Sequence, residues 1–149
     1  MELSIHSDAS YMKEALRQAQ YAFDEGEIPV GAVIVCQNRI VARAYNQTEK
    51  LQDVTAHAEM LAITSAANTL GAKYLSECTL FVTLEPCLMC GGALYWSQMG
   101  RVVYGASDPK RGVLQVGASV FHPKTQVQGG VMQAEAKALL DTFFKNLRG

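Results

Sequence analysis

The chain has 149 residues, of which 13 are basic and 14 acidic, and 49% of them are hydrophobic. This length fits one compact domain, so we treat residues 1–149 as a single domain. With 18% charged residues, the composition is not that of a disordered or fibrous protein. No apolar stretch reaches the roughly 18 residues of a membrane-spanning helix, and the first residues lack the features of a signal peptide. We therefore expect a cytoplasmic protein that does not associate with a membrane.

Basic residues are concentrated toward the C-terminus. Residues 101–149 carry seven basic and three acidic side chains, whereas residues 1–100 carry six basic and eleven acidic ones. A cationic final third could present a surface for a polyanion. The alternative at this point is that these Lys and Arg side chains are simply solvated.

The first predicted elements are a helix and a hairpin. Ser7 or Asp8 is expected to cap the helix, and Gly26 is expected to end it. Two segments rich in strand formers follow, with a two-residue Gln-Asn turn between them. The pattern therefore predicts a β-hairpin formed by Gly31–Cys36 and Arg39–Tyr45.

The remaining elements alternate between helices and strands. Helices are predicted over residues 58–68 and 87–97, with a buried strand over 79–84 between them. Pro86 suits the start of the second of these helices, because its missing N–H would be unpaired there anyway. A strand over 101–104, an irregular Gly-rich stretch to about Gly130 and a helix over 134–147 complete the chain. This order predicts an α/β protein, a three-layer α/β/α sandwich with a mixed central sheet.

Three residues have the types and spacing of a zinc site, namely His57, Cys87 and Cys90. The two cysteines are three positions apart at a helix start, so their sulfurs lie on one face of the helix. The positive end of the helix dipole there favours thiolates, which are the form that binds zinc. If the N-termini of the two predicted helices meet, one nitrogen and two sulfurs converge. Such a ligand set favours Zn²⁺ over Mg²⁺ or Ca²⁺.

The number of ligands bears on what the metal would do. Three protein ligands, rather than four, are typical of catalytic zinc sites that keep a position for water. Bound zinc lowers the pKa of that water toward about 7, and Glu59 in the first helical turn is the candidate general acid and base. One alternative is that the three residues are ordinary helix-start and core residues. Another is a structural zinc site completed by Cys36, Cys78 or His122.

This combination resembles the signature of the zinc-dependent cytidine and adenosine deaminases, through His57-Ala58-Glu59 and Pro86-Cys87-x-x-Cys90. The likeness is closest to the bacterial tRNA-specific adenosine deaminases and extends from about residue 11 to residue 148. It depends on the order of segments 28–33, 55–59, 83–87 and 105–108, together with Asn46 and the late Phe143-Phe144 pair. The resemblance implies a cytidine deaminase-like sandwich whose sheet has about five strands.

The resemblance also implies an activity, namely hydrolytic deamination of the wobble adenosine of a tRNA anticodon to inosine. Zinc-bound hydroxide would attack the base, and Glu59 would be the proton shuttle. It further implies one Zn²⁺ per subunit, no organic cofactor, and a homodimer that binds the tRNA anticodon stem-loop. The substrate-binding residues that it implies are Val30 as an apolar wall, Asn46 in base recognition, Ala58 through its N–H, Asp108 at the anticodon loop and Phe144 beside the flanking nucleotide.

Two other functions stay open from the sequence. One is a zinc deaminase of free nucleobases or nucleosides, which keeps the zinc chemistry and changes the pocket. The other is a non-catalytic, zinc-stabilised subunit that binds RNA or a partner deaminase. Among the substrate residues, Asn46 and Asp108 are also typical of turns, and the adjacent Phe143 and Phe144 cannot share one helix face.

Overall fold

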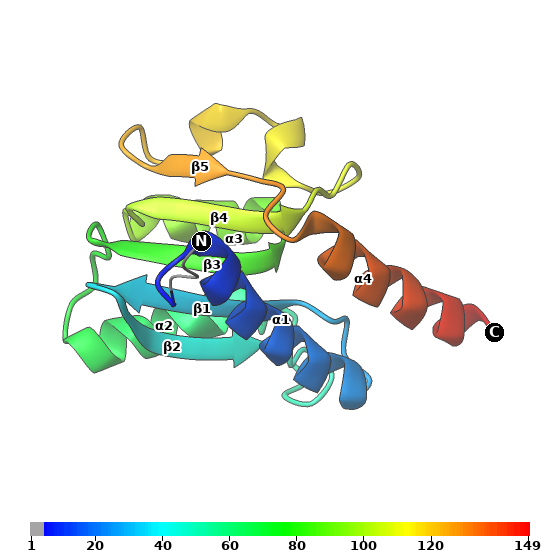
Figure 1. The fold of residues 1–149 in the computed structure, drawn as a ribbon. Helices are drawn as coiled ribbons and strands as arrows, with labels where there is room; N and C mark the ends of the chain where they lie inside the picture. The colour runs from blue at the N-terminus through cyan, green and yellow to red at the C-terminus, as the bar shows by residue number, and fades with distance from the viewer. Residues whose placement is uncertain (1–4) are drawn as a thin grey trace.

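The computed structural model describes residues 5–149 as a mixed sheet between two layers of helices (Figure 1). The helices are α1 (Asp8–Asp24), α2 (Ala58–Leu70), α3 (Leu88–Trp96) and α4 (Gln133–Arg148), with short 3₁₀ helices η1 (Val113–Gln115) and η2 (Ala118–Val120). The strands are β1 (Gly31–Cys36), β2 (Arg39–Tyr45), β3 (Cys78–Leu84), β4 (Arg101–Ala106) and β5 (Gln126–Gln128).

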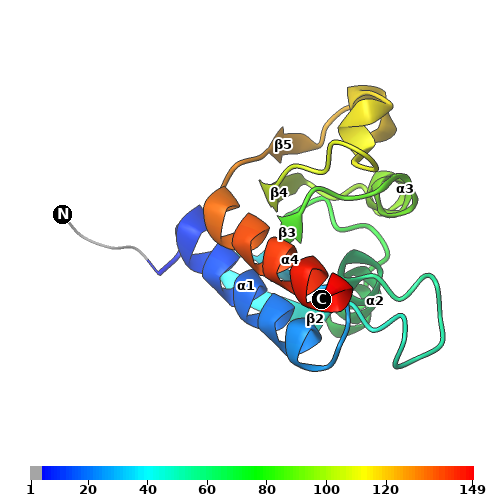
Figure 2. The ribbon, with the colours of Figure 1, turned by 90° about the vertical axis from the view of Figure 1, so that its right-hand side faces the viewer.

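The sheet has the strand order β2-β1-β3-β4-β5. Strand β1 pairs antiparallel with β2 and β3, whereas β4 pairs parallel with both β3 and β5. Helices α1 and α4 cover one face of the sheet, and α2 and α3 cover the other (Figure 2). The predicted three-layer sandwich with a five-stranded mixed sheet is therefore confirmed.

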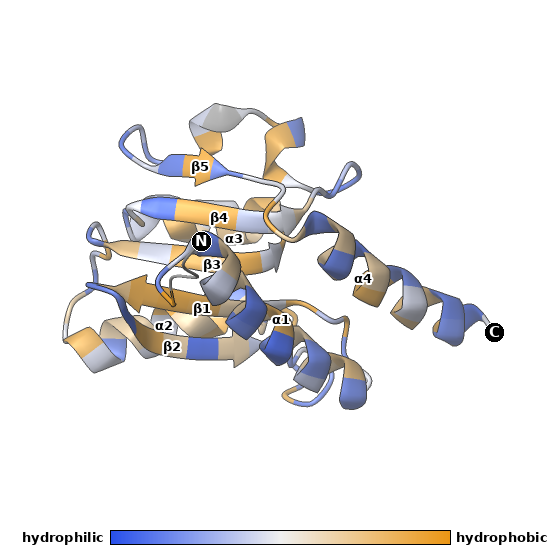
Figure 3. Cartoon of the chain, in the orientation of Figure 1, coloured by the Kyte–Doolittle hydropathy of each residue, from blue (hydrophilic) through white to orange (hydrophobic). Residues whose placement is uncertain are grey.

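The hydrophobic core follows the alternation of side chains along the strands. Ala32 and Ile34 of β1 belong to the larger cluster of buried residues, on the α2 side, while Val33 and Val35 pack under α1. The central strands are accordingly the most hydrophobic part of the ribbon, and α1 and α4 carry hydrophilic residues (Figure 3). Gly31 allows α1 to lie against the sheet, because a Cβ there would overlap the α1 backbone.

Local signals placed most element ends correctly. Ser7 caps α1 by accepting a hydrogen bond from the Ser10 N–H at 3.1 Å. The hairpin turn uses φ values of 52° and 61° at Gln37 and Asn38, the left-handed conformation that a tight hairpin needs. Gly71, with a φ of 64°, ends α2.

Two features differ from the prediction. Strand β4 continues to Ala106, two residues beyond the predicted end. Strand β5 lies in the stretch predicted as irregular, and its three residues are all exposed. Because β5 is defined by pairing with β4 rather than by any hydrophobic alternation, the sequence pattern did not locate it.

This topology brings several chain segments to one edge of the sheet. The parallel strands β3 and β4 end together there, with Leu84 paired to Ala106. Ligands of open α/β sheets commonly bind beyond the carboxyl ends of such strands. In the described part of the chain, no helix combines the length and hydropathy needed to cross a membrane.

Candidate metal centre

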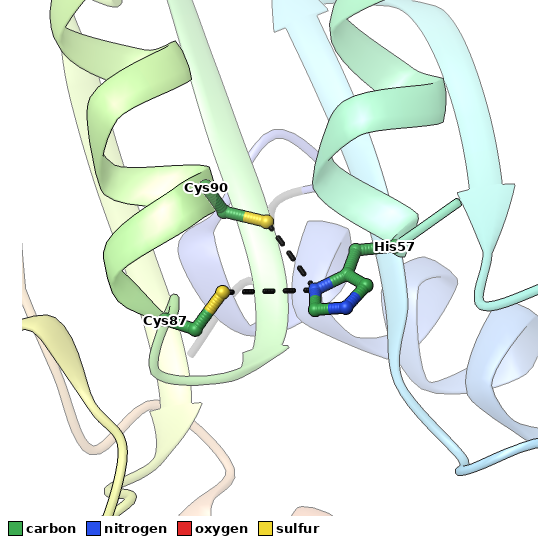
Figure 4. A group of neighbouring side chains, drawn as sticks. All are labelled: His57, Cys87 and Cys90. Carbon is green, nitrogen blue, oxygen red and sulfur yellow. Dashed lines mark hydrogen bonds between the residues drawn. The ribbon is translucent and has the colours of Figure 1, made fainter. Parts of the chain in front are cut away.

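The N-termini of α2 and α3 face each other at this edge (Figure 4). His57 is the N-cap residue of α2 and Cys87 that of α3, and neither uses its side chain to cap its helix. The Nδ1 atom of His57 lies 3.7 Å from the Cys87 sulfur and 3.5 Å from the Cys90 sulfur. The predicted convergence of one nitrogen and two sulfurs is therefore present in the structure.

These distances fit zinc. With Zn–N near 2.0 Å and Zn–S near 2.3 Å, tetrahedral geometry separates the nitrogen and sulfur ligands by about 3.5 Å. Within the described residues, the candidate metal-binding group has three members, whose ligand atoms all lie within 4.8 Å of one another.

The residues considered as a fourth ligand lie elsewhere. Cys36 and Cys78 are directly opposite each other on β1 and β3, at the far end of those strands. The ring of His122 lies 5.7 Å from the ring of Tyr95, and its Nδ1 accepts a backbone hydrogen bond. The geometry thus favours a site with three protein ligands over a closed structural site.

The surroundings of Cys87 favour its thiolate, the form that binds a metal. Hydrogen bonds, first from the Cys90 thiol and then from His57, lower the pKa of Cys87 to about 4. The same thiol–thiolate contact raises the pKa of Cys90, and the hydrogen bond with Cys87 raises that of His57. A thiolate at a helix N-terminus is the arrangement that binds a soft divalent metal.

Glu59 lies beside this group, in the first turn of α2. Its side chain is only 4% exposed. Burial raises the pKa of Glu59 to about 7, and the carboxyl group interacts with Cys87, His57 and Cys90. The first-turn position therefore brings the carboxylate to the three candidate metal ligands, as predicted.

Three of the predicted substrate residues are joined by hydrogen bonds. The Asn46 side-chain oxygen accepts the Ala58 N–H at 2.8 Å, and the Asn46 N–H donates to the Val30 carbonyl at 3.1 Å. All three residues are buried. Asn46 therefore caps α2 across space, in place of the His57 side chain.

The other two predicted substrate residues line a separate part of the edge. Asp108 and Phe144 contribute to an open cleft of about 920 Å³ between the end of β4 and α4. His57, Cys87 and Cys90 are not among the residues that line this cleft, although Leu84, three positions before Cys87, is. Phe143 is buried and Phe144 is 36% exposed, which confirms that only one of the pair is a core residue.

Sequence reasoning missed two buried glutamates, Glu27 and Glu85, which are 2% and 5% exposed. It included Glu85 only within segment 83–87 and gave Glu27 no role. An acidic residue next to a predicted strand was the available signal, but its hydrogen-bond partners are remote in the sequence. Each carboxylate accepts two backbone N–H groups of a loop: Glu27 those of Glu49 and Lys50, and Glu85 those of Asp108 and Leu114.

Comparison with known proteins gives consistent results. Residues 5–106 match the model of the cytidine and deoxycytidylate deaminase zinc-binding region. The tRNA-specific adenosine deaminase of Bacillus subtilis (strain 168) is 44% identical over 146 residues, covering 95% of this chain and 91% of that protein. Its namesake from Aquifex aeolicus (strain VF5) is 44% identical over 142 residues, 93% of this chain and 94% of that protein.

A solved structure from work on A-to-I editing by tRNA:A34 deaminases at the wobble position of transfer RNA is also similar. It has a TM-score of 0.82 and 38% sequence identity, and the match covers 87% of this chain and 98% of that chain.

Proposed function

The chain belongs to the family of the cytidine and deoxycytidylate deaminase zinc-binding region, and we propose that it deaminates the wobble adenosine of a tRNA anticodon to inosine. The observation that carries this proposal is the convergence of one imidazole and two thiols beside a buried carboxylate. Because relatives 44% identical over nearly the whole chain are named as deaminases, the protein is a hydrolytic enzyme rather than a zinc-stabilised binding subunit.

The metal-binding residues in this proposal are His57, Cys87 and Cys90, which would hold one zinc ion per subunit. Zinc in this position would activate a water molecule for attack on C6 of the adenine. No organic cofactor is needed, because the reaction is a hydrolysis. A C–O bond forms at C6, the C–N bond to the amino group breaks, and ammonia leaves.

Glu59 moves the proton that this exchange requires. Its carboxylate accepts a proton from the attacking water and returns it to the departing amino group. The position of Glu59 supports this role, because a buried carboxylate beside the metal ligands is shielded from bulk water.

Asn46 and Val30 orient the base in this proposal. Since the Asn46 side-chain oxygen is already bonded to the Ala58 N–H, its amide N–H₂ group is left to donate to the base. Val30 would supply the apolar surface against which the base packs. The fixed Ala58 N–H keeps the start of α2, and with it Glu59, in one place.

The anticodon stem-loop would lie along the cleft. An exposed aromatic ring such as Phe144 can stack on an unpaired base, and Asp108 would contact the loop near the target. Cationic side chains on the same cleft can contact phosphates, which supports the polyanion surface suggested by the charge distribution. Four basic residues line it: Lys110, Arg111, Lys137 and Arg148.

Helix α3 supports the proposed homodimer. The nine residues of this helix include no charged side chain, and Trp96 and Leu88 are 76% and 55% exposed. A helix that is apolar on all sides is normally buried, so we place α3 in a contact with a second copy. Size-exclusion chromatography with light scattering should give a dimer for the native chain and a monomer for Trp96→Glu. A native monomer at micromolar concentration would contradict the dimer.

We also propose that residues 1–149 act as one domain in the cytoplasm.

The activity is tested with zinc-loaded protein and a transcribed tRNA that carries a wobble adenosine, beside free bases and nucleosides. We expect inosine at the wobble position only, and ammonia in equal amount. Glu59→Ala should retain zinc and lose turnover; inosine formed at the native rate would remove the proposed role of Glu59. Conversion of free bases alone would instead indicate a nucleobase deaminase, and no ammonia from any substrate would indicate a binding subunit.

A further inference from the structure

The buried carboxylate of Glu85 connects the metal-binding segment to the loop of the cleft. One of its oxygens accepts the Asp108 N–H at 3.0 Å, and the other accepts the Leu114 N–H at 2.9 Å. Only 5% of Glu85 is exposed. No Lys or Arg forms an ion pair with this carboxylate among the described residues, so these two backbone hydrogen bonds satisfy its buried oxygens.

Further contacts hold the same two segments together. The Val113 N–H donates to the Pro86 carbonyl at 2.8 Å, and Cys87 forms an antiparallel bridge with Gly112. A Cβ at Gly112 would overlap the Glu85 carboxylate, so the loop backbone passes directly over that group. The segment 108–114 therefore runs beside the segment 85–87, and the Glu85 side chain lies at the centre of their contacts.

This loop carries residues that line the cleft. The side chain of Asp108 accepts the Arg111 N–H at 3.0 Å, while its own N–H is bound by Glu85. Glu85 thus holds the backbone of Asp108 in place. The side chain of Asp108 in turn holds the turn that carries Lys110 and Arg111. Movement of the loop would displace one wall of the cleft.

We infer that Glu85 is a positioning residue, which fixes the 108–114 loop relative to Cys87 so that the tRNA contacts of the cleft are in register with the metal centre. This inference rests on the proposed function. It explains why a carboxylate is present, since two acceptor oxygens are needed for the two N–H groups. A glutamine has one acceptor oxygen and would place an N–H₂ group against the second N–H.

The test is Glu85→Gln in the zinc-loaded, full-length protein. Glutamine loses one of the two hydrogen bonds that hold the 108–114 loop in its binding position. Because the loop then occupies that position less often, we expect KM for tRNA to rise about tenfold. The kcat and the zinc content should stay close to native values. Amide hydrogen exchange should become faster at Asp108 and Leu114, a readout that needs no substrate.

The matched control is Asp8→Asn, which breaks an ion pair with Arg101 at the opposite end of β4. It should lower the melting temperature without changing KM. If Glu85→Gln folds poorly, Gly112→Ala displaces the loop while keeping the carboxylate, and it should raise KM in the same way.

Three results would overturn the inference: an unchanged KM, unchanged exchange at the two amides, or equal losses of kcat and zinc that follow the loss of stability. If the native enzyme forms no inosine in any tRNA, the proposed function fails. The exchange measurement still tests whether Glu85 fixes the loop.

Discussion

Replacing Asn46 separates two roles that the structure combines in one amide group. The side-chain oxygen accepts the N–H of Ala58, a residue with 0% exposure at the start of α2. The N–H₂ group makes no hydrogen bond with the described residues and is assigned to the base in the proposed function. Alanine removes both groups, whereas aspartate keeps an acceptor and removes only the donor.

The expected loss of stability follows from the cap. Losing a helix N-cap acceptor costs about 1 kcal/mol, and leaving a buried N–H unpaired raises the total to about 2 kcal/mol. For a domain of this size, that corresponds to a fall in melting temperature of about 4–8 °C. Asn46→Asp should remain within about 1 kcal/mol of the native protein, because the acceptor is retained.

The assay is thermal and urea unfolding of the zinc-loaded variants, followed by inosine formation on tRNA. We expect Asn46→Ala to lose stability and activity, and Asn46→Asp to lose activity with little loss of stability. Native stability in Asn46→Ala would refute the cap. Native activity in Asn46→Asp would refute the assignment of the N–H₂ group to the base.

Two further predictions concern stability. Asp8 binds Arg101 through two hydrogen bonds of 2.8 and 2.6 Å, and the hydrogen bond from Arg101 holds the pKa of Asp8 below its usual 3.8. The ion pair therefore stabilises the fold above about pH 4, and this stabilisation is lost as the pH falls through the lowered pKa of Asp8. At pH 7 the free energy of unfolding of the native protein should exceed that of Asp8→Asn by about 0.5–1 kcal/mol. The two free energies should converge toward pH 2. Parallel curves for the two proteins would contradict this. Cys90→Ser should lose zinc and melt at a lower temperature than the native protein. The native protein should also melt at a lower temperature after a chelator has removed its zinc. An unchanged melting temperature after chelation would show that the metal does not stabilise the fold.

Much of the fold could be predicted because its signals are local. The Ser7 cap, the left-handed turn at Gln37 and Asn38, and the glycine after α2 each depend on residues within a few positions of one another. The metal group was predictable in part, because the spacing of Cys87 and Cys90 is local, whereas His57 lies 30 positions before Cys87. His57 and Cys87 are both N-cap residues, so once the two helix starts meet, the spacing of the cysteines determines the rest.

The parts that were missed depend on partners distant in the chain. Strand β5 exists through pairing with β4, about 25 residues earlier. Glu85 binds amides 23 and 29 positions later, and Asn46 caps a helix 12 positions later. No periodicity or propensity encodes these contacts, because each requires the tertiary structure that brings the groups together.

The most direct test of the proposed centre is X-ray absorption at the zinc edge of the purified, active protein. We expect two sulfur neighbours near 2.3 Å and two lighter neighbours near 2.0 Å, one from an imidazole and one from water. Three or more sulfurs, or two imidazoles with no water, would contradict a centre formed by His57, Cys87 and Cys90 with a position for water.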